Sequence, residues 1–286
     1  MGSLSTPTTR EERLRARRTR RRRSIAISTT STIVVLGALT TLVLTSPGWH
    51  AVRETFFSWS AFRHAFGQVL SGFWLDVRMF LVVEVVVLVF GLVIALCRIV
   101  QAPALFPLRV LAVVYVDVMR GVPTILVVYL VGFGVPTLAL GGVPTGAVFL
   151  GGAALAMCYS AYVAEVYRAG IESIHPSQAS AALALGLTPT QALRHVVVPQ
   201  AVRRVAPPLL NDFIALQKDV ALVSILGPQE AFRVAQIFAA SQFNYTPLIA
   251  AAALYLCVTI PLTRIVDRLQ ARRVRERGAA IALGPR

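Results

Sequence analysis

Long apolar runs separated by short polar segments dominate this chain. A bilayer core about 30 Å thick requires about 20 apolar residues per helix, because every backbone N–H and C=O must be bonded within the segment. Six stretches satisfy this requirement, so the pattern predicts an all-α integral membrane protein. We expect its spanning helices over residues 25–46, 72–97, 105–131, 145–166, 206–227 and 246–266.

The third stretch is interrupted by the sequence Arg120-Gly121-Val122-Pro123. Pro123 has no N–H to donate to the helix, and Gly121 is a poor helix former. The sequence therefore predicts a bend or break in this span.

Composition supports the membrane assignment and excludes a soluble domain. The 286 residues are 56% hydrophobic and 14% charged, and the net charge is +15. Such a basic chain could bind nucleic acid, but its charges lie mostly at the two ends and in short loops, which argues against that partner. The Arg-rich first 24 residues are expected to lie on anionic membrane lipid. Cys97, Cys158 and Cys257 lie in apolar stretches, and we expect no disulfide.

The first apolar run follows nine arginines, an order that is also typical of a cleaved signal peptide. At about 20 residues it is longer than the apolar region of a signal peptide, so we favour an uncleaved anchor. The expected organisation is a basic tail (1–24), an extra helix (25–46), an external loop (47–71), a five-helix core (72–267) and a basic tail (268–286).

Orientation follows from the distribution of Lys and Arg, because loops rich in these residues stay on the cytoplasmic side. Alternate segments, beginning with the amino-terminal tail, contain 22 Arg residues, whereas the opposite loops contain three, Arg53, Arg63 and Arg233. We therefore expect both termini to be cytoplasmic and the 47–71 and 228–245 loops to face outside.

The segment 168–204 between the fourth and fifth spans has the pattern of two short helices. Ser177 is a candidate cap of the first helix. Thr188 is the candidate cap of the second, with Pro189 at its first position and Gln191 completing a capping box. Gly186 supplies a left-handed stop between the two helices. Isolated helices this short are marginal in water, so they must dock either on the membrane and the chain's own helices or on another protein.

Several motifs, taken together, resemble the permease subunits of polar amino-acid importers of the ATP-binding-cassette class, the histidine, glutamine and arginine permease family. The resemblance covers roughly residues 70–267, and the segment 168–204 contains a sequence similar to the family's cytoplasmic EAA motif. The matching stretches are 120–124, 162–174, 181–182 with Gly186, 198–201, 211–213, 218–219 and 222–225.

This resemblance implies a type I importer permease fold with about six spanning helices in this chain and cytoplasmic coupling helices. It places the ATPase contact on a coupling set of residues. Ser180 stands where the family usually has Glu, which implies altered coupling detail at that position. The expected coupling set is Ser180, Ala181, Ala182, Leu185, Gly186, Leu187 and Pro199.

The resemblance also implies partners. These are ATPase subunits that bind ATP and Mg, a second permease chain, identical or not, and an extracytoplasmic amino-acid binding protein. The chain has no phosphate-binding loop of its own, so we expect no cofactor, no metal and no catalytic residue in it. The expected location is the cytoplasmic (inner) membrane of a bacterium.

Polar residues within spans are candidates for a substrate pathway, because burying them in lipid is costly. Glu84 is expected either to bind a substrate ammonium or to pair with Arg120. Arg120 is expected either to pair with Asp117 or to bind a substrate carboxylate, which a guanidinium can hold with two hydrogen bonds. The full pathway set is Glu84, Arg120, Gly121, Pro123, Thr124, Asp212, Gln217 and Lys218.

Two other functional classes were considered. A secondary transporter driven by an ion gradient through Glu84, Asp117 and Asp212 would work without a partner, but the two halves of the chain show no convincing repeat. A membrane-embedded enzyme would need a nucleophile, metal or paired-carboxylate arrangement, which the spacing does not offer. The importer permease remains the favoured function.

Overall fold

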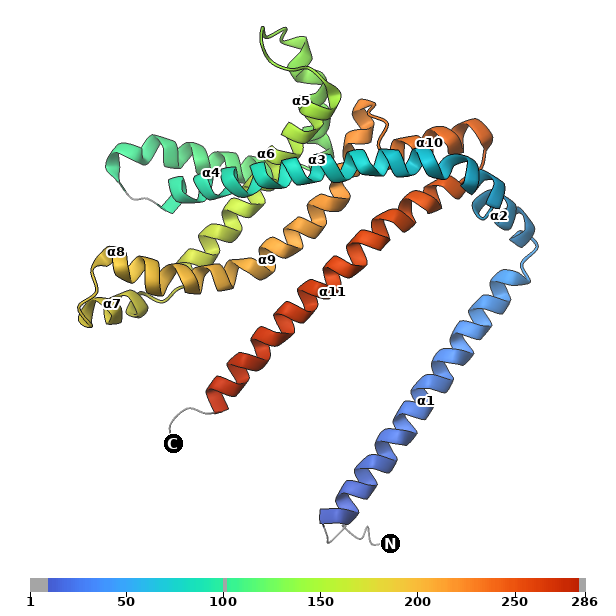
Figure 1. Ribbon diagram of the computed structural model, residues 1–286, viewed down its shortest axis with the longest axis horizontal. Helices are drawn as coiled ribbons and strands as arrows, with labels where there is room; N and C mark the ends of the chain where they lie inside the picture. Colours follow the sequence, from blue (N-terminus) through green and yellow to red (C-terminus); the bar gives the residue numbers. More distant parts are fainter. Residues whose placement is uncertain (1–9, 100–101, 283–286) are drawn as a thin grey trace. The chain divides into compact units, whose positions relative to one another are not determined.

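The computed structural model describes the backbone of residues 10–99 and 102–282 and the side chains of residues 23–99 and 102–271. Within these ranges every regular element is a helix (Figure 1). The α-helices are α1 (Arg10–Leu44), α2 (Trp49–Phe56), α3 (Trp59–Ile99), α4 (Phe106–Gly121), α5 (Thr124–Thr137), α6 (Ala147–Glu172), α7 (Pro176–Ala184), α8 (Pro189–Ala192), α9 (Val198–Asp219), α10 (Ala231–Gln242) and α11 (Thr246–Ala282). Two 3-10 helices, η1 (Pro103–Leu105) and η3 (Val220–Leu226), and a π-helical turn, η2 (Leu193–Val197), join them.

The chain forms two units, residues 1–57 and 58–286. The described part of the first unit consists of α1 and α2. Residues 23–44 of α1 are long and apolar enough to cross a membrane. In α2, Trp49, Val52 and Phe56 follow helical spacing, whereas His50 and Glu54 lie one turn apart and form an ion pair of 3.6 Å. This short helix is therefore amphipathic.

The second unit is built around α3 and α6. Buried side chains of α3, α5, α6, α9 and η3 form its main hydrophobic cluster, in which Val87, Leu155 and Leu216 have no exposed surface. A second cluster joins the first part of α3 to α10 and α11 through Val69, Ala235 and other small residues. These clusters connect segments that are far apart in the sequence.

Four described helical segments are long and apolar enough to span a membrane, or five if the bent pair of α4 and α5 counts as one span. The expected span over 206–227 is not among them. It is divided between α9 and η3, and α9 carries five charged residues, Arg203, Arg204, Asp212, Lys218 and Asp219.

The two segments expected to be external loops are largely helical. Most of the 47–71 segment is helical, forming α2 and the beginning of α3, and most of the 228–245 segment is α10. The reason is tertiary packing, since Ala65 and Val69 of α3 are buried against α10 and α11. The pattern of polar residues alone did not reveal this burial.

The predicted break in the third span is present. Helix α4 ends at Gly121, and α5 begins at Thr124 at an angle of 108° (Figure 1). Val122 is extended and Pro123 precedes the first residue of α5. The end of α4, which carries Arg120, therefore lies next to α6.

Candidate functional site

The segment between α6 and α9 folds as a compact tip made of α7, a turn and α8. The capping box predicted at Thr188 is confirmed: the Thr188 hydroxyl accepts from the Gln191 N–H (3.3 Å), and the Gln191 side chain accepts from the Thr188 N–H (2.9 Å). Gly186 has φ +85°, and the Leu187 N–H donates to the Ala182 carbonyl (3.2 Å). This is the left-handed end of a helix that the sequence predicted.

Two details of the predicted segment are wrong. The cap of α7 is His175, whose Nδ1 accepts from the Ser177 N–H (3.2 Å), rather than Ser177 itself. The second helix is not a separate short helix, because α8 continues through the π-helical turn η2 into α9. Pro199 has no N–H to donate, and its ring crowds the preceding helical turn. The wider π-helical turn just before it reduces this crowding.

The coupling set divides into inward and outward residues. Ala182 packs inward, with 4% of its surface exposed, whereas Leu185 beside the turn is 84% exposed. Leu187 is half-buried, and the Ser180 hydroxyl donates to the Pro176 carbonyl (3.2 Å) within α7. The other members of the set are exposed: Ser180, Ala181, Gly186 and Pro199.

The tip is tied to the helices that carry it. The Gln200 amide donates to the Gln178 side chain (3.2 Å), and Arg204 of α9 donates to the Ser173 carbonyl at the end of α6. Gly170 of α6 lies so close to Val205 of α9 that a β-carbon on Gly170 would overlap the valine. A displacement of the tip would therefore act on both α6 and α9.

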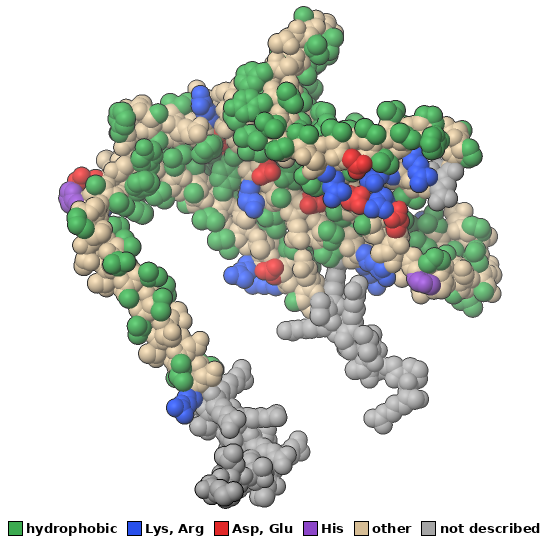
Figure 2. Space-filling model, turned by 180° about the vertical axis from the view of Figure 1, so that it is seen from behind, with side chains coloured by type: hydrophobic (Ala, Val, Ile, Leu, Met, Phe, Trp, Pro, Cys, Tyr) green, Lys and Arg blue, Asp and Glu red, His purple; other side chains and the backbone are tan. Residues whose placement is uncertain are grey.

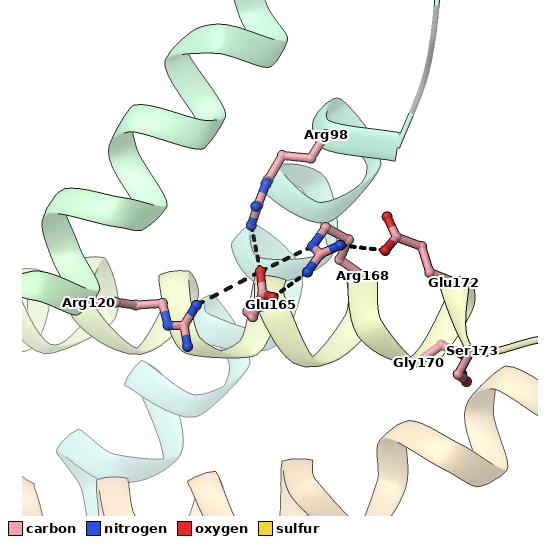
Figure 3. Close-up of polar contacts among 7 residues, drawn as sticks. All are labelled: Arg98, Arg120, Glu165, Arg168, Gly170, Glu172 and Ser173. Atoms are coloured by element: carbon pink, nitrogen blue, oxygen red, sulfur yellow. Dashed lines mark hydrogen bonds and ion pairs between the residues drawn. The ribbon is translucent and has the colours of Figure 1, made fainter.

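Next to this junction, Glu165 gathers three arginines from three helices (Figure 3). Arg98 of α3 lies 2.8 Å from its Oε2, and Arg168 of α6 binds it through Nε (3.1 Å) and Nη2. Arg120 of α4 is the most distant, at 3.9 Å. Arg168 also pairs with Glu172. Spacing in the sequence could indicate only the Glu165–Arg168 part of this cluster, because Arg98 and Arg120 come from other helices.

Arg120 is the least committed of the three arginines. Its side chain is 42% exposed, and its guanidinium lies 5.8 Å from the centre of the Tyr162 ring. The predicted local pair with Asp117 is wrong: Asp117 is exposed, and no ion pair joins the two side chains in the described part of the chain. Arg120 instead faces Glu165 and interacts electrostatically with Asp212.

Two carboxyl groups lie in the interior near Arg120. Glu84 is 9% exposed and interacts electrostatically with Asp212, and Oδ2 of Asp212 is buried without a hydrogen-bond partner in the described structure. No ion pair between Glu84 and Arg120 forms among the described residues, so that predicted pair is wrong. The arrangement combines one guanidinium and two carboxyl groups beside the α4–α5 break.

Gln217 of the predicted pathway set, and Asp219 near it, have structural partners. The Thr259 hydroxyl donates to the Gln217 side chain (2.8 Å), which joins α11 to α9, and the Tyr159 hydroxyl donates to Asp219 (2.8 Å), which joins α6 to the end of α9. Lys218 is exposed. Gly121, Pro123 and Thr124 form the break itself and bring no charged group to it.

The structure also brings together residues that sequence analysis did not combine. Asp76 of α3 accepts a hydrogen bond from the Tyr255 hydroxyl of α11 (2.8 Å) and lies beside Glu230 at the start of α10. Elsewhere on the molecule, several acidic and basic side chains gather next to one another on the face seen in Figure 2. The only sequence signal for Glu230 was its place before a helix, where a carboxylate can cap N–H groups.

A groove of about 880 Å³ lies between α3, α4 and α6 and is lined mainly by apolar side chains such as Met79, Phe90 and Phe149. None of the predicted pathway residues lines it. In the described part of the chain, no group of three or more His, Cys, Asp and Glu side chains could hold a metal ion.

Comparison with known proteins gives a consistent result. Residues 88–276 match the family described as the binding-protein-dependent transport system inner membrane component. The chain is similar to the arginine transport system permease protein ArtQ of Bacillus subtilis, with 32% identity over 198 residues that cover 69% of this chain and 88% of that protein. It is also similar to the probable glutamine ABC transporter permease protein GlnM of Bacillus subtilis, with 34% identity over 64% of this chain and 83% of that protein.

Among solved structures, the crystal structure of an amino acid ABC transporter with histidines is similar to 72% of this chain and covers 94% of its own, with a TM-score of 0.65 and 32% identity. An inward-facing structure of the MetNI methionine ABC transporter shares the fold over 71% of this chain and 95% of its own, with a TM-score of 0.57 and 19% identity.

Proposed function

This chain belongs to the binding-protein-dependent transport system inner membrane components and is the multi-pass permease of an ABC importer for amino acids, and we propose that it forms the translocation pathway and couples it to ATP hydrolysis in a separate subunit. In this proposal the partner ATPase binds ATP and Mg. The permease chain contributes the pathway and the surface on which the ATPase acts.

The single observation that carries the coupling proposal is the turn at the end of α7. Leu185 is 84% exposed beside Gly186, whose φ of +85° makes a tight turn that leaves the leucine at the outer limit of the tip. Exposing a whole leucine to water is unfavourable by about 1.5–3 kcal/mol relative to burying it. We propose that a cleft on the ATPase covers this leucine.

The connections of the tip support coupling by a rigid movement. Ala182 and Ala192 are buried inside the tip, and the Thr188 capping box holds the turn. Arg204 and Gly170 then join the tip to α6 and α9. A movement of the ATPase would thus shift both helices and change which side of the membrane the pathway faces, which is alternating access.

We place the tip and both termini in the cytoplasm, because the segments that share their side contain 22 of the Arg residues counted in loops and tails. The start of α10 then lies near the outer surface, where an extracytoplasmic binding protein delivers the amino acid. A second permease chain completes the pathway.

For the substrate, we propose that Arg120 binds the α-carboxylate. Releasing Arg120 from Glu165 has a small cost, because the two groups are 3.9 Å apart. Glu165 then still pairs with Arg98, at 2.8 Å, and with Arg168. Asp212 interacts electrostatically with both Arg120 and Glu84. The two carboxyl groups offer negative charge for the α-ammonium. A zwitterion therefore finds both charges matched at the break between α4 and α5.

Site-directed crosslinking tests the coupling proposal. Leu185→Cys, purified in mild detergent from its native membrane with its partners, should crosslink to an ATPase subunit. The matched control is Ala182→Cys, three residues before Leu185 but only 4% exposed, which should not crosslink. Both variants need Cys257 replaced, because it is also exposed. Equal crosslinking of the two cysteines, or none to an ATPase, would contradict the proposed docking surface.

A further inference from the structure

A buried pair of carboxyl groups joins three helices at the start of α10, away from the tip and the Arg120 region. Asp76 of α3 is 2% exposed, and Glu230 has no exposed surface. Both lie where α3, α10 and α11 pack against each other through the cluster that includes Val69, Phe73 and Val234 (Figure 1). Nothing in the proposed transport cycle uses these two residues.

Each carboxyl group accepts hydrogen bonds from neighbouring helices. Glu230 caps α10 by accepting from the N–H groups of Phe232 (2.7 Å) and Arg233 (2.6 Å). Oδ2 of Asp76 accepts from the Tyr255 hydroxyl (2.8 Å) and, at 3.4 Å, from the Ala231 N–H. Oδ1 of Asp76 is buried and has no hydrogen-bond partner among the described residues. A buried oxygen of this kind is costly unless something binds to it.

The contact between α3 and α10 leaves little space for an ion with its water. A β-carbon on Gly72 would lie 2.7 Å from both the Ala231 nitrogen and the Glu230 carbonyl carbon. The remaining surroundings are apolar, and the rings of Phe73 and Tyr255 meet edge to face at 5.3 Å. The candidate ligand for the free oxygen must therefore be very small.

Neither carboxyl group has a cationic partner in the described part of the chain. No ion pair involves Asp76 or Glu230, and the side chains of Arg78 and Arg233 are exposed. His64 of α3 is exposed and packs edge-on against Phe238 of α10. The amino-terminal end of α10 favours one negative charge, but burial and the mutual repulsion of two neighbouring carboxylates strongly oppose ionisation of both.

We propose that Asp76 and Glu230 together bind one proton, and that this shared proton helps to hold α10 against α3 and α11. The step is a simple protonation in which one of two carboxylates takes a proton from water. The proton supplies a hydrogen-bond donor between the two side chains, which lie at the same end of α10, since Asp76 accepts from the N–H of Ala231, the residue after Glu230. Its loss leaves two adjacent negative charges, and their repulsion loosens the start of α10.

The direction of the pH dependence follows from Glu230, which lies outside the membrane-spanning segments. Burial, and then the charge of Asp76, raise the pKa of Glu230 from 4.5 to about 7. Between these two values the folded protein holds a proton that the unfolded chain has released. Stability is therefore lost as the pH rises from about 4.5 to about 7, and the loss is complete above that range.

Thermal unfolding of the full-length chain with its copurified partners tests the proposal. For the wild type, the unfolding temperature should fall by roughly 5 °C between pH 5 and pH 8. Glu230→Gln keeps an oxygen to cap α10 and supplies a permanent N–H donor, so its unfolding temperature should change much less and exceed the wild-type value at pH 8. A wild-type pH response in Glu230→Gln would overturn the proposal.

Two controls identify the titrating group and the ligand. His64→Asn should keep the wild-type pH response, and loss of the response in this variant would assign it to His64 instead. At pH 8, NaCl and KCl should have equal effects on the unfolding temperature. Stabilisation by NaCl alone would assign the pair to a sodium ion and overturn the proton.

Tyr255→Phe keeps the test decisive even if Glu230→Gln does not fold. Removing the hydroxyl that donates to Asp76 disfavours the ionised pair, so the midpoint of the pH response should move to higher pH. Infrared spectroscopy of the same variant should show the C=O stretch of a protonated carboxyl group persisting to correspondingly higher pH. A midpoint and a band that do not move would overturn the proposal.

Discussion

Arg98 Nη1 lies 2.8 Å from Glu165 Oε2, and this ion pair joins the end of α3 to α6. The two side chains are 13% and 23% exposed, so the pair is largely shielded from water. Arg168 and Arg120 approach the same carboxylate from α6 and α4. One acidic residue therefore balances positive charge from three helices, close to where α6 leads into the tip.

We expect Glu165→Gln to destabilise the protein by about 1–3 kcal/mol, because it leaves partly buried guanidinium groups without their counter-ion. The thermal unfolding temperature in detergent should fall by several degrees. Glu172→Gln is the matched control, since Glu172 is 52% exposed and pairs only with Arg168 among the described residues. That control should change stability by less than about 1 kcal/mol. Equal effects of the two substitutions would contradict the central role of Glu165.

Gly170→Ala should weaken the packing of α6 on α9, because its β-carbon would overlap Val205. We expect a loss of about 1–3 kcal/mol, measured as a lower unfolding temperature. Adding Val205→Ala should restore part of the loss by making room. Gly67→Ala, in a part of α3 with nothing near the new β-carbon, should be neutral or stabilising. No recovery in the double variant would mean that the overlap is not the cause.

Gly186→Glu should abolish ATP-driven uptake while the protein remains inserted and folded. No atom lies within 4 Å of a β-carbon at this position, so the substitution meets no clash within the chain and places bulk and charge on the outer surface of the tip. Gly186→Asn is the control for backbone strain, because asparagine tolerates a positive φ. We expect it to retain most of the uptake in proteoliposomes. Equal loss in both variants would point to the turn rather than to the partner surface.

Arg120→Gln should raise the amino-acid concentration needed for half-maximal uptake by about 10-fold or more, as expected for loss of a charge-assisted carboxylate contact. Its unfolding temperature should stay near the wild-type value, because Glu165 keeps two closer arginines. Arg78→Gln, another exposed arginine on a span, is the control and should leave uptake unchanged. Unchanged uptake in Arg120→Gln would make Arg120 a structural residue.

Local features of the fold could be predicted because their physical causes lie within a few residues. The capping box at Thr188, the left-handed Gly186 and the break at Pro123 each depend on near neighbours in the chain. Apolar length likewise indicated the spanning helices α6 and α11. Hydrophobic pattern failed where charge and burial compete, as in α9, which carries five charged residues.

Partners of the polar residues could not be predicted from spacing. The sequence placed Arg120 beside Asp117, but the break after α4 directs it to Glu165, which lies 45 residues farther along the chain. Asp76 lies within the expected second span, and no near neighbour in the sequence indicates its partners, which are Tyr255 and the start of α10. These contacts depend on how the helices cross, which no short stretch of sequence encodes.

By itself, the sequence determined that this chain is helical and embedded in a membrane, that it resembles an importer permease, and where its tip turns. Hydrophobic burial and helix capping act over a few residues, and they can therefore be recognised from the order of residues. Only the tertiary structure decided which distant polar groups meet, because buried groups pair by distance in space rather than by order in the chain. Glu165 has Arg168 on its own helix, but Arg98 and Arg120 reach it only when α3 and α4 pack against α6. Asp76 likewise meets Tyr255 only when α3 packs against α11.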